Sequence, residues 1–372
     1  MTEGQSTFEN HQAVPFRHDG SHIHSLNGLR AVSIFIVIAS HYTRIGAIPS
    51  GFGVSIFFVI SGFLITRLLL GDMERTGSIS LPAFYWRRFF RLFPAILTGI
   101  VVALGVQELT GHDWVTVDRV IASLFFFQNY WGIAYPFTGP LGVHWSLSIE
   151  EHFYLVFPIA LVVFHRRLGV GFVSILLMIC LAVLLLRGWS VSTFDDIEIA
   201  KSTIYKATHY RIDTILAGCI LALMAHHEST RAMLQRIVAQ YPITLGLAVL
   251  IAGHTLNGET EIAIKHTTQA VGITLIIAGV LFSDRCEFPR WALNLPIAVW
   301  IGRLSFSLYL LHMQADHLAA HFLPWGPHDW PTLPIAVALA VLMSWACYAW
   351  IEQPMIKAGK KLRASPRLAA VF

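Results

Sequence analysis

The sequence predicts an all-α, polytopic integral membrane protein with about ten transmembrane helices and one re-entrant or broken helix. Its 372 residues are 55% hydrophobic and only 13% charged, whereas about a quarter of the residues in a soluble domain are charged. About ten or eleven apolar stretches are long enough to span a bilayer, with short loops between them. We therefore expect one membrane domain at 26–356, between a polar cytoplasmic tail at 1–25 and a basic cytoplasmic tail at 357–372.

Charge and cysteine usage argue against two other kinds of protein. The formal net charge is +4 and the basic residues lie in loops, where they indicate topology rather than a nucleic-acid surface. The four cysteines are single and lack the spacing of a zinc site. We expect free thiols, no metal and no nucleic-acid partner, and nothing in the sequence predicts an oligomeric state.

The first predicted span, at about 28–46, carries two ionisable residues that suggest function. Arg30 stands near its start and His41 near its end. Ionisable side chains are costly inside a membrane and commonly mark functional sites there. On an α-helix the two lie about three turns, or about 16 Å, apart on nearly the same face. Because no convincing small-residue cleavage site follows, we expect the span to be retained.

Small residues distinguish the second span, which reads GVSIFFVISGFLITRLLL. Small side chains allow transmembrane helices to approach closely. Gly53 and Gly62 therefore predict that this span packs against the first.

A basic and aromatic segment follows at 71–91, before the chain re-enters the membrane. Its arginines predict a cytoplasmic location by the positive-inside rule. Arg88 and Arg91 are neighbours on one face of an expected interfacial helix. Two guanidinium groups suit a phosphate group, but anchoring at the membrane surface explains them as well.

The count of crossings predicts the broken helix. Three apolar stretches, 93–109, 119–135 and 145–164, separate that basic segment from the next basic cluster. If both clusters are cytoplasmic, an even number of these stretches crosses the membrane. The sequence VIASLFFFQNYWGIAY is the best candidate for the exception, because Asn129 and its neighbour Gln128 are polar. Such a helix is tolerated where it is buried in protein or lines a wet cavity.

Two adjacent carboxylates open the third of these stretches, WSLSIEEHFYLVFP. Glu150 and Glu151 could supply acid–base chemistry or hold a histidine or arginine in place. Acidic residues early in a helix are also stabilised by the helix dipole. We favour a functional role because two carboxylates stand together in an otherwise apolar stretch.

Later spans carry three further candidates. Arg211 and Asp213 either form a structural ion pair or bind a polar acceptor. His312 is a second intramembrane imidazole, and it serves either packing or catalysis. The basic residues after the last span place both termini in the cytoplasm, which in a bacterium means an inner-membrane protein.

Six motifs in this order resemble the transmembrane acyltransferase-3 family over nearly the whole chain. They read LNGLRAVSIFIVIASHY, GVSIFFVISGFLIT, RFFR, WSLSIEEHFYLVFP, IGRLSFSLYLLH and IEQP. The resemblance implies an integral membrane enzyme that transfers acyl groups, commonly acetyl from cytoplasmic acetyl-CoA, to hydroxyls of sugars or other acceptors. Some members carry a fused extracytoplasmic hydrolase-like domain, which we do not expect in this chain.

Carried over residue by residue, the resemblance places the family's basic residue and histidine of the first helix on Arg30 and His41. The family's paired arginines fall on Arg88 and Arg91. Its serine and glutamate fall on Ser148 and Glu151. The chain departs from many members at His152, where they have glutamine.

The expected reaction is O-acylation. The phosphates of acyl-CoA would bind Arg30, Arg88 and Arg91. His41 would act as general base or, as a lesser alternative, would carry the acyl group covalently. Glu150 or Glu151 would orient His41 or balance its charge. Substrate contacts are expected from the remaining candidates, which are Ser148, Asn129, Arg211, Asp213 and His312. The partners would be acyl-CoA, a carbohydrate or glycoconjugate acceptor and the lipid bilayer.

Three alternatives stay open. One is an acyltransferase acting on a small molecule such as a macrolide, and another is a proton-coupled transporter, since buried Arg, His and Glu also describe carriers. A purely structural scaffold is the third, but it gives no reason for the buried histidine.

Overall fold

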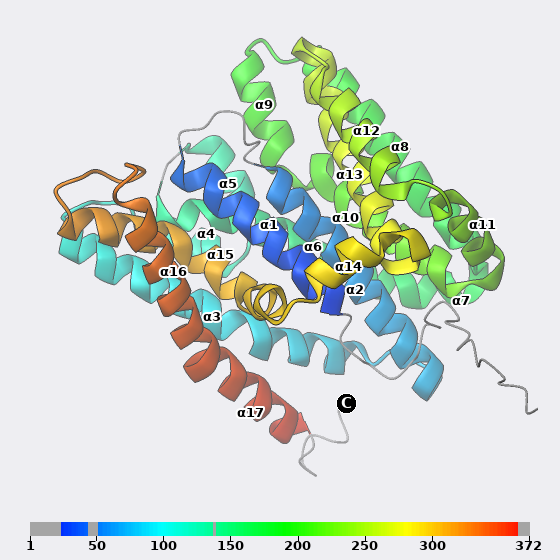
Figure 1. Cartoon of the computed structure of the whole chain (residues 1–372), viewed down its shortest axis with the longest axis horizontal. Coiled ribbons are helices and arrows are strands. Elements are labelled where there is room, and N and C mark those ends of the chain that lie inside the picture. The colour runs from blue at the N-terminus through cyan, green and yellow to red at the C-terminus, as the bar shows by residue number, and fades with distance from the viewer. Residues whose placement is uncertain (1–23, 44–50, 137–138, 364–372) are drawn as a thin grey trace, which may run out of the picture.

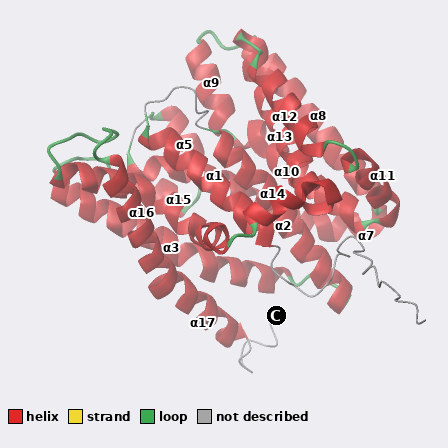
Figure 2. Ribbon diagram, in the orientation of Figure 1, coloured by secondary structure: helices red, strands yellow, loops and turns green. Residues whose placement is uncertain are grey.

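Helices make up almost all of the computed structural model, which describes residues 24–43, 51–136 and 139–363. No strand occurs in these ranges (Figure 2). The first half contains α1 His24–Tyr42, α2 Phe52–Thr76, α3 Leu81–Thr110, α4 Val117–Leu124, α5 Gln128–Ala134, α6 His144–Ala160, α7 Arg166–Leu168 and α8 Gly171–Val191. The second half contains α9 Ile197–Lys206, α10 Thr208–His226, α11 Glu228–Val238, α12 Pro242–His254, α13 Gly258–Phe282, α14 Glu287–Leu293, α15 Pro296–Phe322, α16 Leu333–Cys347 and α17 Gln353–Arg363.

Short 3₁₀ turns precede α6, at Pro140–Val143, and α14, at Asp284–Cys286. Two π-helical turns, Leu161–His165 and Tyr348–Glu352, continue α6 and α16 without a break. Each carries the extra backbone residue per turn that defines a π-bulge.

The centre of the molecule is formed by α1, which packs against both α2 and α15 (Figure 1). α2 in turn packs along α10, and α3 runs beside α15. Gly53 approaches α1 at Ser33 and Val37, as the small residues of this span predict. Gly62 instead lies against α10, where Gly218 faces α2 in return. A side chain at either of these two glycines would overlap the backbone of the opposite helix, so the pair fixes a very short distance between α2 and α10.

The separate interfacial helix expected at 71–91 is not observed. α3 is a single helix of 30 residues that contains both the arginine pair and the following apolar stretch. The Ser80 side chain caps its start by accepting from the N–H of Ala83, and Gly111 ends it in a left-handed conformation at φ 70°. With strong signals at both ends, the helix continues through the basic residues and past the interior Pro94.

The stretch expected to be re-entrant or broken is divided into two short helices, α4 and α5. Phe126 lies between them with a φ of 57°, a conformation that side-chain-bearing residues rarely adopt. Asn129 is buried behind this break, and its side-chain amide donates to the backbone oxygen of Lys206 and to Thr208 Oγ1.

The count of about ten spans is not confirmed. Six helices of the described chain are long and apolar enough to cross a membrane, or up to eight if two bent pairs each count as one span. The bends are 77° between α11 and α12 and 69° between the Asp284–Leu293 segment and α15. α12 alone has only 13 residues, whereas a span needs about 20. α1 and α10 have 19 residues each but are less apolar, because they carry the polar candidates of the sequence.

Candidate functional site

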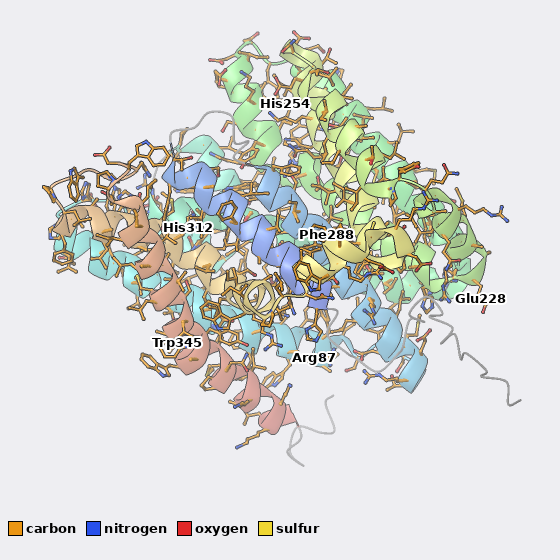
Figure 3. All side chains as sticks on the ribbon, viewed as in Figure 1. Arg87, Glu228, His254, Phe288, His312 and Trp345 are labelled. Carbon is orange, nitrogen blue, oxygen red and sulfur yellow. The ribbon has the colours of Figure 1, made fainter. Side chains whose placement is uncertain are left out.

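His41 and His312 meet where α1 packs against α15. His312 Nε2 lies 3.1 Å from His41 Nδ1, and the two ring centroids are 5.0 Å apart. His312 is fully buried, while His41 is half-buried. Tyr42 adds a second link, because its hydroxyl donates to the backbone oxygen of His312. Figure 3 labels His312 and also Arg87, which lies near the start of α3; in this view the two residues are well separated.

The contacts of the pair define which nitrogens carry protons. His312 Nδ1 lies 3.1 Å from the Leu308 carbonyl oxygen and 2.9 Å from that of Tyr309. A carbonyl oxygen only accepts, so Nδ1 of His312 carries the proton and its Nε2 keeps a lone pair. That lone pair accepts from Nδ1–H of His41. Nε2 of His41 is therefore unprotonated when the ring is neutral, as a general base requires.

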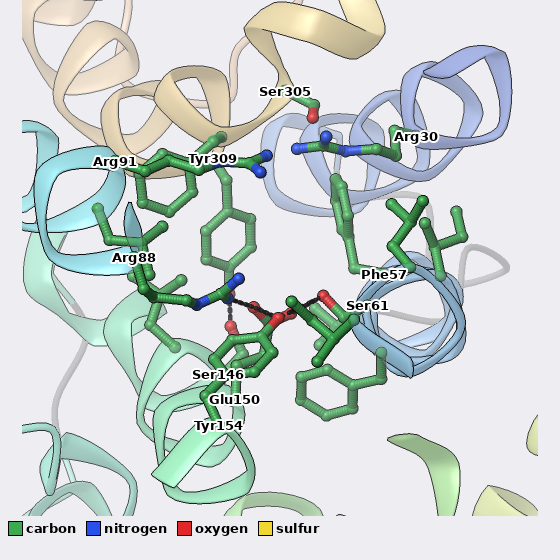
Figure 4. A pocket seen from close by; sticks show the side chains of 18 residues that line it. Arg30, Phe57, Ser61, Arg88, Arg91, Ser146, Glu150, Tyr154, Ser305 and Tyr309 are labelled. Atoms are coloured by element: carbon green, nitrogen blue, oxygen red, sulfur yellow. Dashed lines mark hydrogen bonds and ion pairs between the residues drawn. The ribbon is translucent and has the colours of Figure 1, made fainter. Parts of the chain in front are cut away.

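A cavity of about 90 Å³ lies among α1, α2, α3, α6 and α15 (Figure 4). Arg30, Arg88 and Arg91 all line it, and so do Glu150 and Tyr154. We call it the arginine cavity. Figure 4 shows Arg30 and Arg91 extending toward each other from α1 and α3, while Arg88 extends toward Glu150. Arg30 of α1 thus shares one space with Arg88 and Arg91 of α3.

Arg88 is held by the two carboxylates of α6. Its Nε donates to Glu151 Oε1 at 3.4 Å, and Arg88 NH2 lies 4.0 Å from Glu150 Oε2. The guanidinium also lies 3.1 Å above the centre of the Tyr154 ring. Ser61 and Tyr154 both donate to Glu150, each at 3.3 Å. The expectation that a glutamate orients His41 does not fit these contacts, because both carboxylates face Arg88 and His312 occupies the position beside His41.

Arg30 and Arg91 differ from Arg88 because no described carboxylate lies within 4.0 Å of either guanidinium. Arg30 is half-buried and Arg91 is exposed where it lines the cavity. Their charges interact with each other and with that of Glu352, whose Oε1 accepts from Ser307 Oγ. Two guanidinium groups therefore retain donors for an anionic ligand.

The arginine cavity and the histidine pair are adjacent along α15. Ser305, Phe306 and Tyr309 of this helix line the cavity. The Tyr309 ring centroid is 6.0 Å from that of His312, and its hydroxyl donates to the backbone oxygen of Val143 at 2.8 Å. A ligand extending from the arginines along α15 would thus approach the histidine pair.

The other expected substrate contacts lie elsewhere. Ser148 donates to the His144 backbone oxygen one turn earlier in α6, and Asn129 fixes the start of α10. Arg211 and Asp213 do not pair with each other. Asp213 instead binds Arg187 of α8, with its Oδ2 2.6 Å from Arg187 NH2. Arg211 contacts Ser55 and His266.

Glu352 and Tyr309 are the residues of this site that our sequence reasoning missed. Glu352 stands in the IEQP motif as an acidic residue inside a membrane segment, a signal that could have identified it. Tyr309 carries no comparable signal, because an aromatic residue in an apolar helix is ordinary. His312 was identified, but its contact with His41 depends on how α1 and α15 pack.

Comparisons with known proteins identify a family and its relatives. The family model described as "Acyltransferase domain" matches residues 23–349. "Putative O-acetyltransferase SACOL0978" of Staphylococcus aureus strain COL is 29% identical over 367 residues, covering 91% of this chain and 58% of the relative. "O-acetyltransferase OatA" of S. aureus strain NCTC 8325 is 30% identical over 351 residues, covering 90% of this chain and 57% of the relative.

This chain thus spans a little over half the length of the curated relatives that it matches. No solved structure matches it. Its membrane-spanning helices and the match over nearly all of its length confirm the resemblance seen in the ordered motifs. The chain is an integral, multi-pass membrane protein and belongs to the acyltransferase-3 family.

Proposed function

We propose that this protein is a membrane O-acetyltransferase that moves an acetyl group from cytoplasmic acetyl-CoA to a hydroxyl of a carbohydrate or glycoconjugate on the extracytoplasmic side. The observation that carries the proposal is the His41–His312 contact, which leaves Nε2 of His41 unprotonated. Tyr309, which lines the cavity of the three arginines, has its ring centroid 6.0 Å from that of His312. The names of the similar S. aureus proteins support acetyl as the group transferred.

The arginine cavity would receive the donor. Arg30 and Arg91 offer planar, bidentate donors that match phosphate oxygens. A cavity of about 90 Å³ admits the acyl end of a thioester rather than a whole nucleotide. The nucleotide would remain at the exposed Arg91, on the side that the positive-inside rule assigns to the cytoplasm.

The histidine pair would perform the proton transfers. The acceptor oxygen attacks the thioester carbon while its proton passes to Nε2 of His41. A C–O bond forms, the C–S bond breaks, and the leaving thiolate takes the proton back from His41. The sum is an ester and free CoA thiol. His312 holds Nδ1 of His41 throughout, so that the charge which develops on His41 faces a neutral imidazole.

A transfer assay tests this proposal. Membranes containing the full chain are incubated with radiolabelled acetyl-CoA, and the label in glycan is counted. We expect His41→Ala to lower transfer about 100-fold or more, because general base catalysis contributes about 10²–10⁴. His254→Ala, a matched change of an exposed histidine at the end of α12, should leave transfer unchanged. Transfer retained by His41→Ala at normal expression would refute the mechanism.

A further inference from the structure

A second cavity, of about 340 Å³, lies beyond the histidine pair at the ends of α3 and α15. We call it the distal cavity. Its lining consists of Thr110, His112, Trp114, Gly139, Met313, His317, Ala320, His321, Pro327 and His328. α3 and α15 run side by side toward this end of the molecule (Figure 1).

The two cavities lie on opposite sides of His312 along α15. Ser305, Phe306 and Tyr309 line the arginine cavity, whereas Met313 and His317 line the distal cavity. The step from Tyr309 to Met313 is about one helical turn, or about 6 Å. His312 falls within that turn and contacts His41. The histidine pair therefore stands between the two spaces.

One wall of the distal cavity is made of three packed rings. The centroid of Trp114 is 4.1 Å from that of His112, in a stacked arrangement, and 4.3 Å from that of His317. The Trp114 backbone is fixed as well, because Gln107 Oε1 accepts from the N–H groups of Trp114 and Val115 at 2.8 and 2.6 Å. The rings thus form a rigid aromatic surface.

Another residue of the lining, His328, lies beside a buried carboxylate. Asp316 is fully buried, and its Oδ2 lies 3.0 Å from Nδ1 of His328. His328 is one of two described non-glycine residues with a positive φ, at 67°. With Nδ1 of His328 beside the carboxylate, its Nε2 is the nitrogen farther along the ring that could meet a ligand. His328 is also near enough to His41 for their charges to interact.

The chemistry of this lining selects a neutral, hydroxyl-rich ligand. No lysine, arginine or carboxylate is among the lining residues, so a phosphate or another strongly charged group finds no partner. Imidazole nitrogens donate and accept hydrogen bonds, as sugar hydroxyls require, and the Thr110 hydroxyl, which donates to the Val106 backbone oxygen, can still accept one.

We infer that the distal cavity is the acceptor subsite and binds a pyranose ring, packed against Trp114 and hydrogen-bonded by His317 and His328. This inference rests on the proposed function and adds to it the residues that recognise the acceptor. An aromatic surface with a few convergent polar groups is the usual composition of a site for a compact, partly apolar ligand. The acceptor hydroxyl would point along α15 toward His41.

Binding to the full-length protein in nanodiscs tests the subsite without catalysis. Saturation-transfer-difference NMR is recorded with maltotetraose, chitotetraose and mannotetraose. We expect ring-proton signals from at least one of them, lost in Trp114→Ala and in His317→Ala. Trp189→Ala, which changes an exposed tryptophan of α8, should keep the signals. Signals from none of the three sugars, or signals that survive both changes in the cavity, would overturn the inference.

Kinetics separate the subsite from the proposed function. With the sugar that binds, Trp114→Ala should raise the acceptor KM about tenfold and leave the acetyl-CoA KM unchanged, while Trp114→Phe should largely preserve it. If transfer depends on His41 but Trp114→Ala leaves the acceptor KM unchanged, the inference fails and the proposed function stands. If a sugar binds at Trp114 but no acetyl transfer occurs, the proposed function fails and the subsite stands.

Discussion

Two buried guanidinium–carboxylate sites in this protein are built differently. Arg187 is fully buried, and its NH2 lies 2.6 Å from Oδ2 of Asp213. It also donates to the Thr267 hydroxyl and to the Tyr210 backbone oxygen. Arg88 lies 3.4 Å from Glu151 and 4.0 Å from Glu150, and its side chain keeps 13% of its surface exposed beside a cavity.

The difference separates a structural ion pair from a binding site. A charge in a low-dielectric interior is tolerated only if hydrogen bonds and an opposite charge satisfy it. Arg187 meets that condition within the protein, so it holds α8, α10 and α13 together. The arginine cavity meets it only in part, because Arg30 and Arg91 lack carboxylate partners among the described residues, and an anionic ligand would complete it.

Breaking the structural pair should have the largest effect. Asp213→Ala leaves Arg187 buried without its counter-charge and should lower the free energy of unfolding by about 3–5 kcal/mol. Thermal unfolding of the purified protein in detergent measures this loss. The double change Arg187→Met with Asp213→Leu, which removes both charges, should recover most of the stability. An Asp213→Ala protein that unfolds at the wild-type temperature would contradict the assignment.

Removing an unpaired arginine should affect donor binding instead. Arg91→Gln should raise the acetyl-CoA KM about 10–100-fold, because a hydrogen bond to a charged group contributes about 1.5–3 kcal/mol. The unfolding temperature should stay close to wild type, since no described carboxylate loses its partner. Steady-state kinetics at varied acetyl-CoA concentration give the KM. If Arg91→Gln destabilised the protein as much as Asp213→Ala does, the contrast between the two sites would disappear.

Exchanging arginine for lysine gives the smallest change and compares the sites directly. Arg88→Lys keeps the charge near Glu150 and Glu151 but loses the planar stacking on Tyr154, so we expect an increase in acetyl-CoA KM of only about threefold to tenfold. Arg187→Lys should lower the unfolding temperature more than Arg88→Lys does, because one ammonium group does not reproduce the several contacts of Arg187. Equal stabilities of the two variants would argue against the distinction.

Much of the fold could be predicted because apolar length and helix caps are local properties. The helical class, the second span and the interruption near Phe126 follow from such signals. The continuity of α3 through Arg88 was missed, because charged residues in a long helix resemble a surface segment until packing buries them. The number of spans is not confirmed, and one reason is that an apolar run as short as α12 looks like a crossing in sequence.

The site could be predicted only in its parts. Arg30, Arg88 and Arg91 were identified as candidates by their positions in or near membrane segments, and they line one cavity; their role as phosphate ligands stays a prediction. It was harder to predict which residues contact each other than to predict which residues belong to the site. Arg211 and Asp213 are close in sequence yet bind different helices, because residues two apart on a helix do not face each other. The contact of His41 with His312 depends on helix packing and has no local signal.

The π-helical turn at Tyr348–Glu352 sets how the last part of this helix is rotated relative to α16. A π-turn contains one residue more than the α-helical path over the same distance. If the same residues followed an α-helical path instead, the helix would remain continuous, but the side chains beyond the turn would rotate by about 100° relative to those before it. The carboxylate of Glu352 would then leave Ser307 and turn away from Arg30 and Arg91. The length of this turn, and not only the identity of its residues, is therefore part of what places a negative charge beside the arginine cavity.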